Sequence, residues 1–204
     1  MKKIPTIFQR TEDRRGVTSE WNPECLWVRD GEGTPTRKWD GSCCLVRGPK
    51  DMHDLWHLFK RYEAKPGSKI PDDALPSPDQ WLDPVTGKTQ CWVPVGEGPE
   101  DQWHREAWKD FWNESNSRIS MREEGTYELI GPKVNGNKDR SETHRLVKHG
   151  STLLAEMAFI FSHTGVTREK ILSELMTRNI EGIVWHHEDG RMAKIKRRDF
   201  GLPW

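Results

Sequence analysis

Long apolar runs are missing from this sequence. No stretch approaches the roughly 20 apolar residues that a helix needs to cross a bilayer. The first five residues, Met1-Lys2-Lys3-Ile4-Pro5, contain no apolar stretch of the signal-peptide kind. We therefore expect a cytoplasmic protein with no membrane among its partners.

Cysteine is scarce as well, with four residues at positions 25, 43, 44 and 91. They form no Cys-x-x-Cys pair and have no histidine at zinc-ligand spacing, which argues against a zinc finger. Cys43 and Cys44 adjoin within an apolar segment. We expect reduced and mostly buried thiols.

An excess of either charge is also missing, because 32 Lys and Arg side chains balance 32 Asp and Glu side chains. No global field therefore favours a polyanionic partner, and any nucleic-acid surface must be a local basic patch. Tryptophan, by contrast, is abundant: 11 indole rings can fill a core or stack on bases. The length predicts one domain over residues 1–204.

Alternating or short apolar runs predict most of the secondary structure as strands. These runs lie at residues 25–29, 42–47, 125–131, 144–149, 180–186 and 192–197. The turn Asp30-Gly31-Glu32-Gly33 follows the first of them. Residues 153–161 fit either a helix or a strand.

Three segments have the spacing of helices. In residues 51–63, Leu55, Leu58, Phe59 and Tyr62 share one helical face. A second helix, from Asp101, is expected to bury Trp103, Ala107, Trp108, Phe111 and Trp112, and a third begins at the N-cap Thr167 and ends near Asn179. Seven of the 13 prolines fall between Pro66 and Pro99, which predicts a long, lid-like loop interrupted by a hairpin at residues 85–88.

Lys38 lies in Lys38-Trp39-Asp40-Gly41, at a junction between predicted strands. A nucleophilic lysine needs a deprotonated amine held in one direction, and such a junction can hold it. The glycine would allow a nucleotide to approach the backbone closely. Asp-Gly is also a common turn dipeptide, so this segment alone is a weak signal.

Two carboxylates and two lysines in predicted strands strengthen the prediction that Lys38 is catalytic. Glu128 and Glu181 are flanked by apolar residues, where an unpaired charge is costly. Each could pair in a buried salt bridge; alternatively, Glu128 could bind a ribose hydroxyl and Glu181 a hydrated Mg²⁺. Lys194 and Lys196 share one side of a strand, which suits either a triphosphate or a solvated edge strand.

In order and spacing, these segments resemble motifs I, III, IV and V of the covalent nucleotidyltransferases, which include DNA ligases, RNA ligases and mRNA capping enzymes. The matching segments are Lys38-Trp39-Asp40-Gly41, Tyr127-Glu128-Leu129-Ile130-Gly131, Glu181-Gly182-Ile183-Val184 and Lys194-Ile195-Lys196. The resemblance implies an α+β nucleotidyltransferase (ligase adenylation) core of antiparallel sheets with flanking helices. It also implies that Lys38 forms a lysyl-nucleotide bond, Glu128 lies near the sugar, Glu181 supports a metal, and Lys194 and Lys196 contact phosphate.

Within that superfamily, the residues of these motifs are most similar to those of small 5′-to-3′ RNA ligases of the vertebrate type. DNA ligases and capping enzymes usually carry an arginine where this chain has Cys43, and Arg47 is a candidate substitute for binding the nucleotide. Only eight residues follow Lys196, so the resemblance implies no OB domain and leaves room for an accessory protein as a partner.

The implied reaction is ATP-dependent sealing of RNA. Lys38 would take AMP from ATP, the AMP would pass to an RNA 5′-phosphate, and a 3′-hydroxyl would then displace it. ATP and Mg²⁺ or Mn²⁺ are the implied cofactors, with Asp40 helping to organise the metal or the lysine. Alternatives are a capping-type guanylyltransferase, a DNA ligase, or a non-catalytic nucleotide- or RNA-binding protein on a ligase core.

Basic residues near these motifs form the candidate RNA surface. They are Lys133, Lys138, Arg140, Arg145, Lys148, Arg197 and Arg198. His53 and His57 have helical i, i+4 spacing and fit an exposed face better than a metal site. His186 could line the pocket or serve strand packing.

Overall fold

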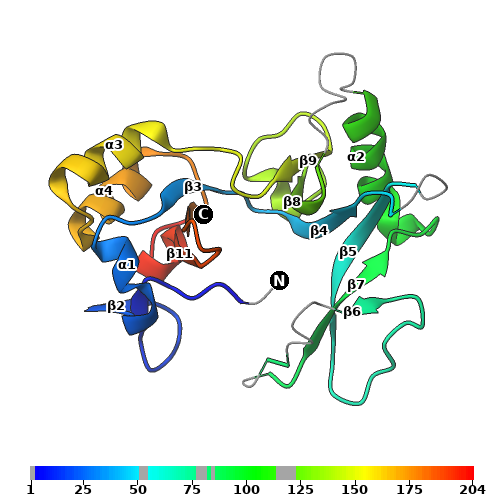
Figure 1. The fold of residues 1–204 in the computed structure, drawn as a ribbon, viewed down its shortest axis with the longest axis horizontal. Coiled ribbons are helices and arrows are strands. Elements are labelled where there is room, and N and C mark those ends of the chain that lie inside the picture. The colour runs from blue at the N-terminus through cyan, green and yellow to red at the C-terminus, as the bar shows by residue number, and fades with distance from the viewer. Residues whose placement is uncertain (1–2, 51–54, 77–81, 84–85, 114–122) are drawn as a thin grey trace. The chain divides into compact units, whose positions relative to one another are not determined.

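The computed structural model describes residues 3–50, 55–76, 82–83, 86–113 and 123–204, which fall into two compact units (Figure 1). We call residues 40–149 the sheet unit, and residues 3–39 together with 150–204 the lysine unit. The chain passes from one unit to the other at residues 39–40 and again at 149–150. The expectation of one domain stays a prediction.

The predicted class is confirmed, since helices accompany antiparallel sheets. Every pairing between named strands in the described parts of the chain is antiparallel. None of the described helices is both long and apolar enough to traverse a bilayer. All four cysteines lie in described segments without a disulfide, and Cys25, Cys44 and Cys91 are buried as predicted.

The sheet unit is built on a sheet whose described strands run in the order β6-β7-β5-β4-β8-β9. The strands are β4 (Ser42–Arg47), β5 (His57–Ala64), β6 (Leu75–Pro76), β7 (Thr89–Pro94), β8 (Gly125–Ile130) and β9 (Arg145–Lys148). Helix α2 (Gln102–Asn113) and the 3-10 turns η2 (Pro99–Asp101) and η4 (Asn135–Asn137) complete it.

One face of this sheet packs on α2. Ala107 of α2 joins Cys44 and Val46 of β4 and Tyr127 and Leu129 of β8 in one buried cluster. Because side chains alternate along a strand, the intervening residues of β4 and β8 point to the opposite face. The functional candidates of these two strands therefore lie on the face away from α2.

The lysine unit contains a sheet of order β11-β10-β3 and a separate hairpin, β1-β2, among its described strands. The strands are β1 (Phe8–Arg10), β2 (Val17–Trp21), β3 (Thr34–Lys38), β10 (Gly182–His186) and β11 (Met192–Lys196). The helices are α1 (Leu26–Arg29), α3 (Ala155–Thr164) and α4 (Arg168–Thr177), with 3-10 turns η1 (Pro23–Cys25) and η5 (Arg197–Phe200).

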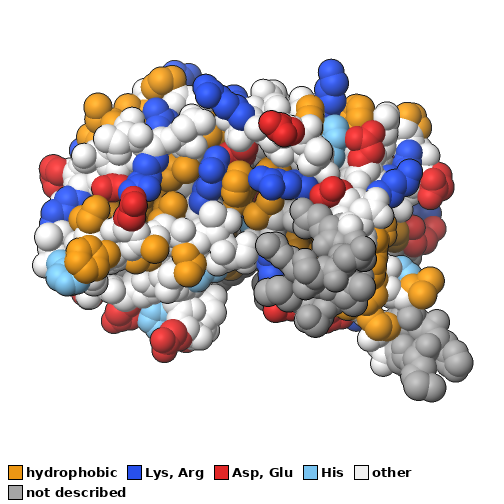
Figure 2. All heavy atoms as spheres, turned by 90° about the horizontal axis from the view of Figure 1, so that it is seen from above, with side chains coloured by type: hydrophobic (Ala, Val, Ile, Leu, Met, Phe, Trp, Pro, Cys, Tyr) orange, Lys and Arg blue, Asp and Glu red, His pale blue; other side chains and the backbone are white. Residues whose placement is uncertain are grey.

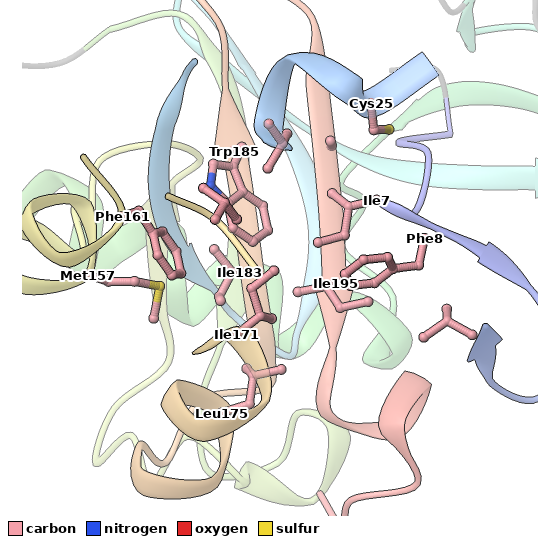
Figure 3. Packing of buried hydrophobic residues seen from close by; sticks show 14 of the residues in the cluster. Ile7, Phe8, Cys25, Met157, Phe161, Ile171, Leu175, Ile183, Trp185 and Ile195 are labelled. Carbon is pink, nitrogen blue, oxygen red and sulfur yellow. The ribbon is translucent and has the colours of Figure 1, made fainter. Parts of the chain in front are cut away.

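The core of the lysine unit surrounds β10 and β11. Figure 3 shows Met157 and Phe161 of α3, with Ile171 and Leu175 of α4, beside the strand that carries Trp185. Burial of such apolar side chains is the main force that fixes the two strands. The strands in turn position the charged residues that alternate with the core residues.

Residues 57–64 correct one prediction, because they form strand β5 and not the end of a helix. The strand pairs with β4 on one side and β7 on the other. Leu58 and Phe59 are adjacent and both buried, at 6% and 7% exposure. An interior strand buries side chains on both faces, and the resulting apolar doublet imitates helical spacing. His53 lies outside the described residues.

A second correction concerns residues 25–29, predicted as a strand but helical over Leu26–Arg29. The Asn22 side chain caps the preceding 3-10 turn by accepting from the Glu24 N–H, and Pro23 occupies its first position. Asparagine followed by proline is a helix-start signal. The predicted turn at residues 30–33 follows it.

Within the proline-rich segment 66–99, the structure has a strand where the sequence predicted a loop. Residues 89–94 form β7, an interior strand of the sheet, although the segment was predicted as a loop. The hairpin is present in the described residues as a bridge between Leu82 and Thr89. Strands β4, β8, β9, β10 and β11 and helices α2 and α4 lie where the sequence predicted them, and residues 153–161 resolve mainly as helix α3.

Candidate active site

Lys38 and Glu181 form an ion pair in the lysine unit. Lys38 is the last residue of β3 and pairs with Gly182, the first residue of β10, so Glu181 precedes that pair directly. The Lys38 Nζ lies 2.6 Å from Glu181 Oε2 and also donates to the Trp39 carbonyl at 3.2 Å. The ammonium group is thus held at a strand end, as the sequence predicted.

Glu181 bridges two lysines. Gly182 also pairs with Lys196 of β11, and the Lys196 Nζ lies 2.5 Å from Glu181 Oε1. The Glu181 side chain is 7% exposed, against 19% for Lys38 and 14% for Lys196. A carboxylate buried to this extent needs such partners, so the salt-bridge expectation for Glu181 is met.

Lys194 adds a third cation to this cluster. Burial, together with the charges of Lys196, Lys38 and Arg10, lowers its pKa to about 7, while the Asp199 charge acts in the opposite direction. Burial followed by the Lys38 charge lowers the pKa of Lys196 as well. Lys194 interacts electrostatically with Lys38 and Lys196, and the single Glu181 carboxylate that pairs with those two lysines leaves an excess of positive potential, which suits a polyphosphate.

Gly182 makes this close arrangement possible. A Cβ at this position would overlap the carbonyl oxygen of Ile195 and approach the Lys196 Cα to 2.9 Å. A larger residue would push β11 away from β10. The glycine of this motif therefore keeps Lys196 within reach of Glu181.

Glu128 belongs to the sheet unit, where it has partners of its own. Its Oε1 accepts a hydrogen bond from the Gly41 N–H at 3.0 Å, and its Oε2 lies 2.8 Å from the His149 Nε2. Cys43, the direct pairing partner of Glu128 across β4 and β8, lies on the same face. Glu128 is thus oriented by a backbone amide and a histidine.

Asp40 and Gly41 are held by the loop after β8. The Asp40 N–H donates to Asp139 Oδ2 at 2.8 Å, while the Asn135 Nδ2 donates to Asp40 Oδ1 and to the Gly41 carbonyl at 3.1 and 3.0 Å. A Cβ on Gly41 would overlap the carbonyl oxygen of Leu129. Strand contact requires this glycine, independently of any nucleotide.

Arg47 lines a pocket of about 560 Å³ in the sheet unit. Leu45, Trp92 and Thr126 are among its other lining residues. Its walls combine an indole ring, a guanidinium group and aliphatic side chains, a set that can accept a flat polar ring.

The candidate RNA residues divide between the units. Lys133, Lys138 and Arg140 are exposed on the loop after β8, whereas Arg145 and Lys148 are half-buried in β9. On the face shown in Figure 2, basic side chains are interspersed with acidic ones, as a balanced composition predicts.

Arg197 and Arg198 differ in their surroundings. The Arg197 guanidinium donates to the backbone carbonyls of Leu175, Arg178 and Pro203, which ties the η5 turn to α4 and favours a structural role. Arg198 is exposed. Of the two, Arg198 is the better placed to meet a phosphate.

Comparison with known proteins finds similarity to RNA ligase 1. The family described as RNA ligase 1 matches residues 110–204. RNA ligase 1 of Pongo abelii is 26% identical over 83% of this chain and 68% of its own length. That of Mus musculus is 27% identical over 83% and 67%, and that of Danio rerio 31% over 76% and 50%.

The chain is similar to proteins named RNA ligase 1. The matched residues 110–204 contain Glu128, Glu181, Lys194 and Lys196, whereas Lys38 precedes them. The reading of Lys38 as the nucleophile therefore rests on its own motif and on its contact with Glu181.

Several residues that contact the candidate site were not predicted from the sequence. His149, Asn135 and Asp139 contact Glu128, Asp40 or Gly41, although none has a motif of its own. One available signal was the Asn135-Gly136-Asn137 run, since Asn and Gly tolerate the positive φ angles of 44°, 73° and 51° found there.

Lys194, Lys196 and Glu181 are the residues that would hold the phosphates and the metal that the resemblance implies. Lys194 and Lys196 would hold phosphate oxygens, for which two partly buried cations are suited. Glu181 is one carboxylate, enough for a Mg²⁺ that keeps several waters and phosphate ligands. Mg²⁺ or Mn²⁺, when bound, would offset the negative charge of the phosphates.

Proposed function

We propose that this protein is an ATP-dependent RNA ligase that joins 5′-phosphate and 3′-hydroxyl ends through lysyl-AMP and RNA-adenylate intermediates. The observation that carries the proposal is Glu181, which holds the amines of Lys38 and Lys196 at 2.6 and 2.5 Å. Likeness to proteins named RNA ligase 1 supports RNA as the substrate.

In the first step, the Lys38 Nζ attacks the α-phosphorus of ATP. A phosphorus–nitrogen bond forms, the bond to the β-phosphate oxygen breaks, and pyrophosphate leaves. Lys38 must lose a proton, and Glu181 Oε2, at hydrogen-bond distance, is within reach to receive it. Lys194 and Lys196 stabilise the negative charge that develops on the phosphate oxygens.

The two later steps use the same cations. An oxygen of the RNA 5′-phosphate attacks the phosphorus of the lysyl-AMP and releases Lys38. The RNA 3′-hydroxyl then attacks the activated 5′-phosphate, and AMP leaves. Glu128, oriented by Gly41 and His149, is assigned to the ribose of the nucleotide, and Arg47 to nucleotide binding.

The proposal includes a ligase adenylation core that works alone or with an accessory protein. The antiparallel α+β architecture and the register that aligns Lys38, Gly182 and Lys196 across three strands support it. Asp40, fixed by Asn135 and an Asp139 carboxylate, is assigned to orienting the loop that follows the nucleophile.

The test is intact-protein mass spectrometry after incubation with ATP and Mg²⁺, with GTP in parallel. We expect a mass gain of one AMP that is absent in Lys38→Ala and retained in Lys69→Ala, whose side chain is 79% exposed. A GMP adduct would support the capping-type alternative. No adduct with either nucleotide, under conditions where the protein binds RNA, would support a non-catalytic binding protein.

A further inference from the structure

Three potential metal ligands converge on the face of the sheet unit away from α2. They are the Cys43 thiol, the Glu128 carboxylate and the His149 imidazole, and their ligand atoms all lie within 4.8 Å of one another. These residues are 85 and 21 positions apart along the chain. No sequence motif for zinc connects them, because the sheet ladder brings them together.

The strand register explains the convergence. Cys43 of β4 is directly opposite Glu128 of β8. His149 follows β9 directly, and its N–H donates to the carbonyl of Thr126, two residues before Glu128. Side chains two apart on a strand share a face, so all three groups project to the same side of the sheet.

Each oxygen and nitrogen donor is already oriented by a second contact. The His149 Nδ1 lies 2.9 Å from the Thr126 hydroxyl, which leaves Nε2 facing Glu128. Glu128 Oε1 accepts from the Gly41 N–H, which leaves Oε2 facing His149. Outer hydrogen bonds of this kind orient the ligands of protein metal sites.

We propose that, while no nucleotide is bound, Cys43, Glu128 and His149 bind Zn²⁺ or a chemically similar divalent transition metal, and that a nucleotide whose ribose takes Glu128 competes with this ion. Bond lengths of about 2.0–2.3 Å imply ligand atoms roughly 3.3–3.8 Å apart in a tetrahedral site. The Nε2–Oε2 pair, at 2.8 Å, would have to separate by about 0.5 Å or more to reach this range, and the Cys43 sulfur lies within 4.8 Å of both atoms.

Chemistry distinguishes this site from the Mg²⁺ assigned to Glu181. A thiolate and an imidazole favour zinc, whereas Mg²⁺ prefers oxygen ligands. Glu128 and His149 side chains are 12% and 23% exposed, so an ion can reach them while part of its shell is excluded. Three protein ligands leave a fourth position for water or another small ligand.

Co²⁺ substitution tests the proposal without any measure of ligase activity. The full chain, free of affinity tags, is titrated with Co²⁺ and its absorption spectrum recorded. We expect one equivalent to produce a thiolate-to-cobalt charge-transfer band with the visible bands of a tetrahedral ion, both removed by added Zn²⁺. Cys43→Ser should lose the charge-transfer band, and Cys91→Ala, a buried cysteine in β7, should keep it.

A second variant separates metal binding from folding. Thr126→Val preserves strand shape but removes the partner of His149 Nδ1, and it should weaken Zn²⁺ binding by about 10- to 100-fold. Circular dichroism before each titration establishes that the variants are folded. A wild-type spectrum without the charge-transfer band, or one that Cys43→Ser leaves unchanged, would overturn the proposal and leave His149 as a hydrogen-bond partner of Glu128 alone.

Discussion

The Lys38 amine and the Glu181 carboxylate, 2.6 Å apart, are 143 residues apart in sequence. Antiparallel pairing of β3 with β10 brings them together, because Lys38 and Gly182 are direct partners in that ladder. The contact therefore depends on the register of one strand pair. Any change that shifts this register by one residue would turn Lys38 to the other face of the sheet.

Glu181→Gln should slow AMP transfer to Lys38. The amide keeps the shape of the carboxylate but loses the charge that holds Lys38 and Lys196 and the capacity to take a proton or support a metal. Loss of one such electrostatic contact typically lowers a rate about 10²- to 10³-fold. Single-turnover formation of the AMP adduct at saturating ATP measures the effect, and a wild-type rate would remove Glu181 from the mechanism.

Lys194 should take up a proton when nucleotide binds. With a pKa of about 7, its amine is mostly neutral at pH 8 in the free protein. Bound phosphates favour the ammonium form and raise this pKa, so binding at pH 8 should take up as much as about one proton, and less at pH 6.

Calorimetry in buffers of different ionisation enthalpy measures this uptake. An ATP analogue with a non-scissile α–β bridge keeps the first step from adding its own protons. Lys194→Met should abolish most of the uptake. Equal uptake by the variant and the wild type would assign the proton to another group.

Gly182→Ala should destabilise the lysine unit. The new Cβ would meet the backbone of Ile195, which cannot move as a side chain can. Overpacking of this kind costs about 1–3 kcal/mol of unfolding free energy. Denaturant unfolding measures the loss, and Gly16→Ala in the same unit is the matched control, since its nearest atom would be 3.4 Å away. A loss no larger than that of the control would contradict the assigned role.

The loop after β8 should contribute to RNA binding through charge. Replacing Lys133, Lys138 and Arg140 by glutamate should weaken single-stranded RNA binding and reduce the slope of log K against log salt by about 2, at roughly 0.7 per phosphate contact. Fluorescence anisotropy at several salt concentrations measures this slope. Lys69→Glu is the control, and an unchanged slope in the triple variant would place the RNA elsewhere.

Periodicity predicted most strands but failed where a strand is buried on both faces. In residues 42–47 and 192–196, buried positions alternate with half-buried ones, and both segments were assigned correctly as strands. Leu58 and Phe59 in β5 are buried together, and a pattern with period two does not arise there. Whether a strand is buried on both faces depends on its place in the sheet, and a short stretch of sequence does not reveal that place.

The site was predictable as a set of motifs but not as a set of contacts. Lys38, Glu181 and Lys196 could be named from their segments, and the structure brings them together. His149 could not be named, because its nearness to Glu128 and Cys43 arises from strand pairing. A search for metal-ligand spacing along the chain likewise could not find the cluster of Cys43, Glu128 and His149, because these residues come together only through strand pairing.

Gly41 and Gly182 show that some motif residues are required by the fold, whereas others are required only by the chemistry. Each has no room for a Cβ because the neighbouring strand's backbone is too close. A chain that had lost catalysis but kept its fold would still need both glycines, whereas it would have no such need for the Lys38 amine. In a motif match, the glycines thus report that the scaffold is intact, and only the lysine and carboxylate positions carry information about chemistry.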